Sequence, residues 1–155
     1  MKSNRSIKRR GFTLVELLIV IVVIGVLSAM MMLSSTEAVS SARASNIISN
    51  LRNLKTAALA WYADHLDEAD SVNISTKRAE ILKYMNNEKV EDNYKFTGMG
   101  ANHWFVYYDN LTDTNIRTKL IGRKTSVGLY QITAKDDASS ADLTSNSGNV
   151  GMFIR

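Results

Sequence analysis

Charge and hydrophobicity divide the first part of the chain into three segments. The first ten residues hold five basic side chains and no acidic one. Residues 17–36 follow as twenty residues without any charge, LLIVIVVIGVLSAMMMLSST. Twenty helical residues rise about 30 Å, which matches the hydrocarbon thickness of a bilayer. The run therefore predicts a membrane-spanning helix, since a soluble helix of this length would show a polar face.

The third segment, from residue 37 to about residue 66, is amphipathic. One set of apolar and aromatic positions recurs at spacings of four and three, which places it on a single helix face. That face consists of Ile47, Leu51, Leu54, Ala58, Trp61 and His65, widened by Ile48, Tyr62 and Leu66. Joined to the apolar run, it predicts one helix from about residue 12 to about residue 67, roughly 80 Å long.

The rest of the chain predicts a small mixed structure. A helix is expected from Ser75 or Thr76, as its N-cap, to about residue 86, and another over residues 113–121, with Ile116 and Leu120 inward. Aromatic and β-branched residues predict strands over 104–108, 127–134 and 150–154. The fold class is α+β: a long N-terminal helix, apolar in its first half and amphipathic in its second, packed on a small three-stranded antiparallel sheet.

Composition excludes several functions. The net charge of +4 comes from the first ten residues, because the remainder has 14 basic and 15 acidic residues, a net charge of −1. A basic pI therefore gives no support to nucleic-acid binding. The chain has no Cys and no Pro. No phosphate loop, nucleophile elbow or paired catalytic carboxylate is evident, so we do not expect an enzyme.

The charges around the apolar run predict a topology. Basic residues before it keep the N-terminus cytoplasmic and send the following part across the membrane. A cleaved secretory signal is the competing interpretation, but no small-x-small cleavage site precedes a clear mature start, and helical character continues well past the apolar run. Glu16 stands at the head of the run, between Val15 and Leu17. An ionisable residue there is a functional hypothesis, and a carboxylate that reaches back to the headgroups is the alternative.

Residues 8–27, KRRGFTLVELLIVIVVIGVL, resemble the class III signal of type IV pilins and type II secretion pseudopilins. In that family a basic leader ends in Gly and is followed by Phe-Thr-Leu-x-Glu and an apolar helix. The resemblance implies that a membrane aspartyl prepilin peptidase cuts between Gly11 and Phe12, that Phe12 is N-methylated, and that Glu16 serves assembly. It divides the chain into a leader (1–11), a transmembrane and polymerisation helix (12–36), and an amphipathic helix half with an α+β head (37–155).

The resemblance also implies a function. The chain would be a structural, non-enzymatic subunit that polymerises as a homo-oligomer into a helical filament. Its partners would be the peptidase and methyltransferase, an assembly platform and the inner membrane, with no nucleic acid. The precursor would lie in the cytoplasmic membrane and the assembled subunit in an extracellular pilus or a periplasmic pseudopilus. A secretion pseudopilin, or a minor pilin for adhesion or DNA uptake, are the alternatives.

The sequence departs from this family in two respects. Leu33 occupies the position at which many pilins kink the helix with Pro, and no Cys pair can close a C-terminal loop. In the polar run of residues 135–149, resemblance to major pseudopilins implies a calcium loop at Asp136, Asp137 and Asp142. Their spacing matches no EF-hand and favours a solvated hairpin loop, so no cofactor is expected by default.

Aromatic residues and histidines are the remaining candidates for a binding site. Six aromatics could form a stacking platform, but helix and strand periodicity favours a core role for Trp61, Tyr62, Trp104, Phe105, Tyr107 and Tyr108. His65 and His103 would bind a metal only if the fold brought them together, and no carboxylate stands at a ligand-like spacing around either.

Overall fold

The structure of the protein is a computed structural model, and it describes residues 11–69, 71–85, 90–98, 103–132, 140–141 and 148–155. Its backbone contacts divide the chain into two compact units, Met1–Ala38 and Val39–Arg155. We call the second unit the head. Helix α1 (Leu14–Asp64) contributes to both units, and it runs through Gly25 and Leu33 without a break.

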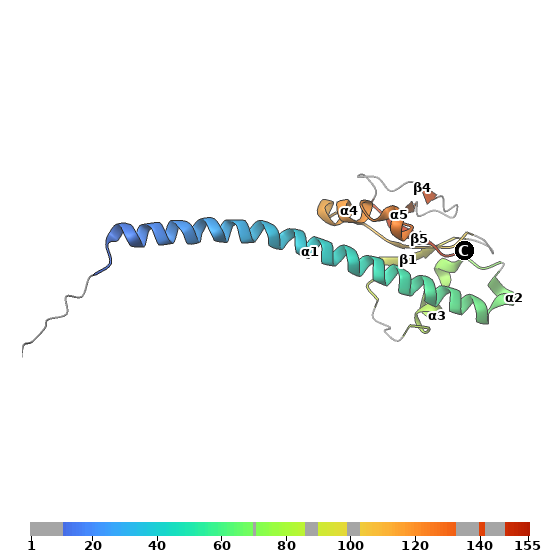
Figure 1. The fold of residues 1–155 in the computed structure, drawn as a ribbon. Coiled ribbons are helices and arrows are strands. Elements are labelled where there is room, and N and C mark those ends of the chain that lie inside the picture. Colours follow the sequence, from blue (N-terminus) through green and yellow to red (C-terminus); the bar gives the residue numbers. More distant parts are fainter. Residues whose placement is uncertain (1–10, 70, 86–89, 99–102, 133–139, 142–147) are drawn as a thin grey trace, which may run out of the picture. The chain divides into compact units, whose positions relative to one another are not determined.

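Besides its part of α1, the described residues of the head form four short α-helices, a 3₁₀-helix and an antiparallel sheet (Figure 1). The helices are α2 (Leu66–Ala69), η1 (Ile74–Lys77), α3 (Arg78–Leu82), α4 (Thr114–Ile121) and α5 (Lys124–Val127). The strands are β1 (Tyr94–Thr97), β2 (Phe105–Tyr108), β3 (Tyr130–Ile132), β4 (Ser140–Ala141) and β5 (Val150–Phe153). The strand order is β1-β2-β5-β3-β4, and every pair is antiparallel.

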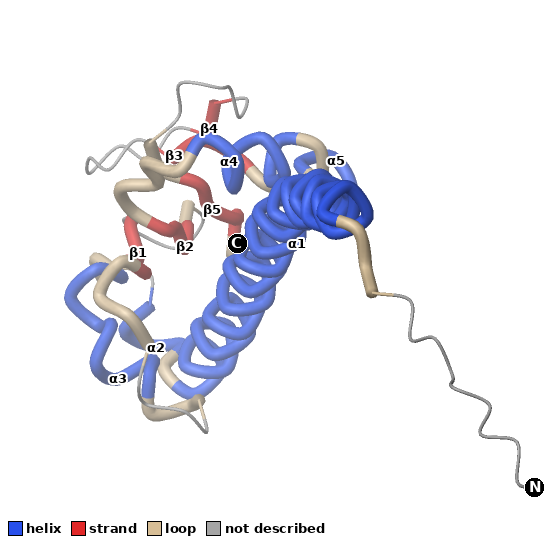
Figure 2. The backbone as a smooth tube through the Cα atoms, turned by 90° about the vertical axis from the view of Figure 1, so that its left-hand side faces the viewer, coloured by secondary structure: helices blue, strands red, loops and turns tan. Residues whose placement is uncertain are grey.

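The sheet packs on the part of α1 that belongs to the head (Figure 2). The predicted apolar face of α1 forms the core: Ile47, Ile48, Leu51, Leu54, Ala58 and Trp61 are all at most 6% exposed. Trp61 meets Trp104 beside β2 at a ring distance of 6.0 Å, and Phe96, Val106 and Met152 supply the sheet side of the core. Trp61 and Trp104 are buried in this core and Tyr62 and Tyr108 are half-buried against it, whereas Phe105 and Tyr107 are buried in a second, small cluster with Ile132. All six aromatic residues are therefore buried or half-buried, as their periodicity indicated.

The α+β class is confirmed, but the expected three strands were too few. All three are present, although β3 covers only residues 130–132 because residues 124–127 form α5 instead. Strand β1 was missed, and it pairs along its whole length with β2, from Tyr94 opposite Tyr108 to Thr97 opposite Phe105. The short β4 is the fifth strand.

Two local predictions were wrong and one was correct. The helical turn after α2 is capped by Asn73, whose side chain accepts from the backbone N–H of Ser75, and not by Ser75 or Thr76. Leu66 is 56% exposed, because α1 ends at Asp64 and the chain leaves the helical face before Leu66 is reached. Helix α4 forms as predicted: Asp113 caps it, and Ile116 and Leu120 are buried.

Candidate functional site

The first turn of α1 is closed by a reciprocal pair of hydrogen bonds. The backbone N–H and the hydroxyl of Thr13 both donate to Oε2 of Glu16, each at 2.8 Å, and the backbone N–H of Glu16 donates to the Thr13 hydroxyl at 3.3 Å. This is a capping box, which satisfies backbone donors that the first turn leaves without partners. The T-x-x-E spacing before an apolar run is its sequence signature. The sequence analysis did not predict this capping box. Its hydrogen bonds give Glu16 a local role beyond the assembly role that the resemblance implied.

The apolar part of α1 has no partner among the described residues. Sixteen large apolar side chains between Phe12 and Met32 are each between 50% and 87% exposed. Within the described part of the chain, α1 is the one helix long and apolar enough to cross a membrane. An apolar surface of this extent marks contact with a membrane or with other protein chains.

Gly11 and Phe12 precede α1 and belong to no helix or strand. Nothing lies within 4 Å of the position that a Cβ on Gly11 would occupy, and Phe12 is 87% exposed. The backbone on both sides of the predicted cleavage point is therefore open to an external enzyme. Residues 1–10, the predicted leader, lie outside the described residues.

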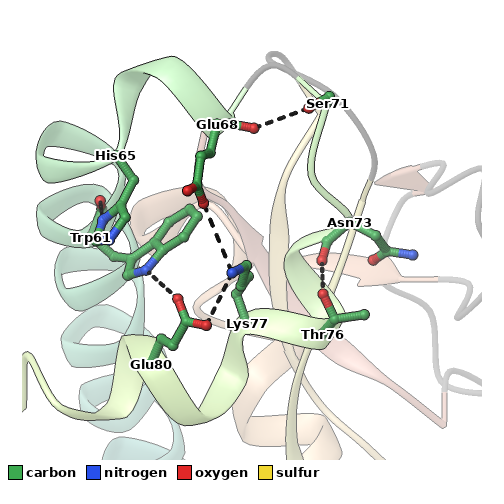
Figure 3. Close-up of polar contacts among 8 residues, drawn as sticks. All are labelled: Trp61, His65, Glu68, Ser71, Asn73, Thr76, Lys77 and Glu80. Carbon is green, nitrogen blue, oxygen red and sulfur yellow. Dashed lines mark hydrogen bonds and ion pairs between the residues drawn. The ribbon is translucent and has the colours of Figure 1, made fainter.

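A polar cluster holds α2 and α3 against the end of α1 (Figure 3). The indole N–H of Trp61 donates to Glu80 at 3.2 Å, and Lys77 donates to the same carboxylate at 3.0 Å and lies 3.9 Å from Glu68. His65 stacks on Trp61 with ring centres 4.6 Å apart, and its Nδ1 donates to the Trp61 carbonyl oxygen. The hydrogen bond from Lys77 is the main reason that the pKa of Glu80 is lowered. His65 is thus used locally for packing.

A cleft of about 330 Å³ lies between α1 and α5. Ile48 and Val127 provide apolar walls, Arg52 and Arg123 provide positive charge, and no acidic residue lines it. Arg123 is held in place by Ser45 and Ser41, whose hydroxyl oxygens accept from its two terminal nitrogens at 2.7 and 3.1 Å. The cleft can therefore receive a group that combines an apolar side chain with a carboxylate or another anion.

A second cleft, of about 610 Å³, is lined by Arg43, Asn50, Glu91 and Tyr94 among others. Arg43 and Arg52 are nine residues apart on α1, about two and a half turns, so they point to opposite sides of the helix. Asn50 donates to the hydroxyl of Tyr94 at 3.0 Å. This cleft has both signs of charge, in contrast to the cleft between α1 and α5.

The remaining predicted sites are not brought together by the described residues. Asp136, Asp137 and Asp142 lie outside them. His103 is exposed, whereas His65 is stacked on Trp61. No group of three or more His, Asp or Glu side chains among the residues that the structure describes could hold a metal ion.

Comparison with known proteins points to the same segment. Residues 7–32 match the family model of the prokaryotic N-terminal methylation motif. The chain is also similar to the type IV major pilin protein PilE of Neisseria gonorrhoeae, with 25% identity over 159 aligned residues that cover 92% of this chain and 88% of that protein. No solved structure matches the chain significantly. The motif covers the capping box and the apolar helix, and the similarity to a type IV pilin continues through the head, so both comparisons support a resemblance to the type IV pilin family.

Proposed function

We propose that the chain is a structural subunit of a type IV pilus-like filament, cut between Gly11 and Phe12, methylated at Phe12 and polymerised through α1. The observation that carries the proposal is the exposed apolar surface between Phe12 and Met32. A large apolar side chain gains about 1.5 to 3 kcal/mol when it is fully buried, so sixteen of them strongly favour lipid or other copies over water. Lipid would cover them in the precursor, and neighbouring copies would cover them in the filament.

The same proposal gives a location and partners. The basic leader keeps the N-terminus of the precursor in the cytoplasm, where a prepilin peptidase and methyltransferase would act, and the head lies on the other side of the inner membrane. An assembly platform would then move the subunit from the membrane into the filament. Similarity to a major pilin along most of the chain favours a pilus over a short secretion pseudopilus.

Glu16 would set the register between subunits by pairing with the free amine of Phe12 on a neighbouring copy. A charged carboxylate costs about 2.5 to 3.5 kcal/mol in the middle of a membrane on insertion scales. Two unit charges about 4 Å apart attract by about 4 kcal/mol at an effective dielectric of 20, which offsets that cost. Methylation leaves the amine charged, so the pair survives it.

The capping box calls for a test that separates its effect from that of the charge. Glu16→Gln keeps an oxygen that can accept from Thr13 but removes the charge, because Gln also serves in capping boxes. Thr13→Ala removes the cap and keeps the charge. Under this proposal Glu16→Gln is still cleaved and inserted, but its yield of sheared filaments per processed subunit falls at least about tenfold, a loss equivalent to about 1.4 kcal/mol.

Thr13→Ala is the matched control and should assemble at nearly the wild-type yield. The opposite pattern, with Glu16→Gln normal and Thr13→Ala defective, would assign the carboxylate to capping alone. Protein degradation cannot imitate either pattern, because yields are measured against processed subunit in the same cells.

A further inference from the structure

Charge is segregated along the head. The part of α1 from residue 39 to residue 63 and the segment from residue 114 to residue 132 together carry seven basic residues and no acidic one. Residues 64–92 carry eight acidic and four basic residues. The two regions are not wholly separate in space, because Glu91 lines a cleft together with Arg43, but α2, with Asp67 and Glu68, follows the C-terminal end of α1 (Figure 1). Two copies placed with one above the other in the same orientation would bring unlike charges together.

The cleft between α1 and α5 is lined by two of these basic residues, Arg52 and Arg123. The guanidinium of Arg123 is oriented by Ser41 and Ser45, so little freedom is lost when it meets an anion. Arg52 is exposed and makes no ion pair within the part of the chain that the structure describes. Between them, the half-buried Val127 offers an apolar side chain, whereas Ile48 is only 6% exposed and belongs to the core.

Helix α2 presents side chains of matching chemistry. Leu66 is 56% exposed and is followed directly by the exposed carboxylates of Asp67 and Glu68. Glu68 lies 3.9 Å from Lys77, whereas Asp67 makes no ion pair with any described residue. Leu66 and the unpaired carboxylate of Asp67 therefore complement the cleft between α1 and α5, which combines an apolar side chain with two guanidinium groups.

We propose that α2 of one copy docks into the cleft between α1 and α5 of a neighbouring copy in the filament, with Leu66 against Val127 and Asp67 beside Arg52. This inference rests on the proposed function, and it concerns head contacts that are separate from the N-terminal helix. The contact cannot form within one chain, because Ile48 and Leu66 are 18 residues apart, about 27 Å along the helix direction. Two different surfaces that meet in this way form a heterologous contact, which generates an open helical polymer.

Charge reversal tests the contact. Arg52→Glu is expected to reduce the yield of sheared filaments per processed subunit about fivefold, as expected for the loss of about 1 kcal/mol at an exposed ion pair. Asp67→Arg should cause a similar loss, and the double variant should recover most of the yield. Arg43→Glu is the matched control, because it reverses an exposed arginine on the opposite side of α1 and should leave the yield nearly unchanged. Equal losses in Arg52→Glu and Arg43→Glu, with no recovery in the double variant, would overturn the proposal.

Cross-linking gives a direct readout of proximity. The chain has no cysteine, so Asn53→Cys beside the cleft and Asp67→Cys in α2 introduce the only two thiols. A short bis-maleimide added to intact filaments of the double cysteine variant should give a ladder of covalent multimers. Each single variant should stay largely monomeric, because the docking brings residue 53 beside residue 67 of the next copy and not beside another residue 53. Filaments without a ladder would refute the docking but leave the proposed function intact.

Two other outcomes are distinguishable. A wild-type chain that is processed but never forms filaments would refute the proposed function and this inference together. Normal filaments from Arg52→Glu, combined with loss of duplex DNA binding by its purified head, would assign the cleft to nucleic acid and overturn the docking.

Discussion

A methyl group added at Gly151 should destabilise the head, because the sheet leaves no room for it. Gly151 lies in β5 between two strands, opposite Tyr107 of β2 and Tyr130 of β3. A Cβ at this position would lie 2.7 Å from Cβ of Tyr107 and 2.7 Å from Cγ1 of Ile132, and closer still to the carbonyl oxygen of Val106. The Val106 carbonyl oxygen is part of the backbone of β2, and Cβ of Tyr107 is bonded directly to that backbone. Neither atom can move away unless the strand itself moves.

The size of the expected loss of stability follows from overpacking. Forcing one extra carbon into a close-packed interior costs about 1 to 3 kcal/mol. For a domain of this size that loss lowers the melting temperature by about 4 °C for each kcal/mol. The same substitution at Gly122 should instead raise the stability of the head. Its φ is −60°, its Cβ would lie 3.6 Å from the Thr118 carbonyl oxygen, and a Gly to Ala change at a compatible site stabilises by about 0.4 to 1 kcal/mol.

Urea unfolding of a soluble fragment that begins at Val39 is the assay, followed by tryptophan fluorescence. Trp61 and Trp104 are both fully buried in the head core, so their emission reports its unfolding. The expected result is a lower urea midpoint for Gly151→Ala and an equal or higher midpoint for Gly122→Ala. A wild-type midpoint for Gly151→Ala would refute the reasoning that the contact between β5 and β2 is too close for a side chain.

Two further predictions concern processing and pH. Gly11→Val should block cleavage, because the peptidase has to accept an extended backbone at that point. The uncleaved precursor would migrate as a chain about 11 residues longer on a denaturing gel. Normal processing of this variant would contradict the assignment of the cleavage site. The pKa of Glu80 is lowered, chiefly by the hydrogen bond from Lys77 and then also by the one from Trp61. The charged carboxylate therefore stabilises the fold above its ordinary pKa of 4.5, and this stabilisation is lost as the pH falls through the lowered native pKa. Glu80→Gln should therefore flatten the fall of the urea midpoint between about pH 5 and pH 3, and an unchanged pH profile would show that this carboxylate does not couple folding to protonation.

The sequence alone determined the N-terminal part of this protein, because the signals there are local. A charge-free run of twenty residues, a basic stretch before it and the order of Gly11, Phe12 and Glu16 can be read without knowing the fold. The head half of α1 was predictable for a related reason. Its buried positions follow the helical repeat for four turns, so the face toward the core is visible in the spacing from Ile47 to Trp61.

Tertiary structure decided the features that join distant segments. Strand β1 has only four residues, and it is recognisable as a strand through its pairing with β2. Leu66 continues the apolar spacing of α1, yet the helix ends at Asp64 and the following turn directs Leu66 away from the core. The cleft between α1 and α5 exists because the fold places Arg123 beside Ser41 and Ser45, 82 and 78 residues earlier in the chain. Periodicity describes which face of an element is buried, but the partner that covers that face is set by long-range packing, which a local pattern does not contain.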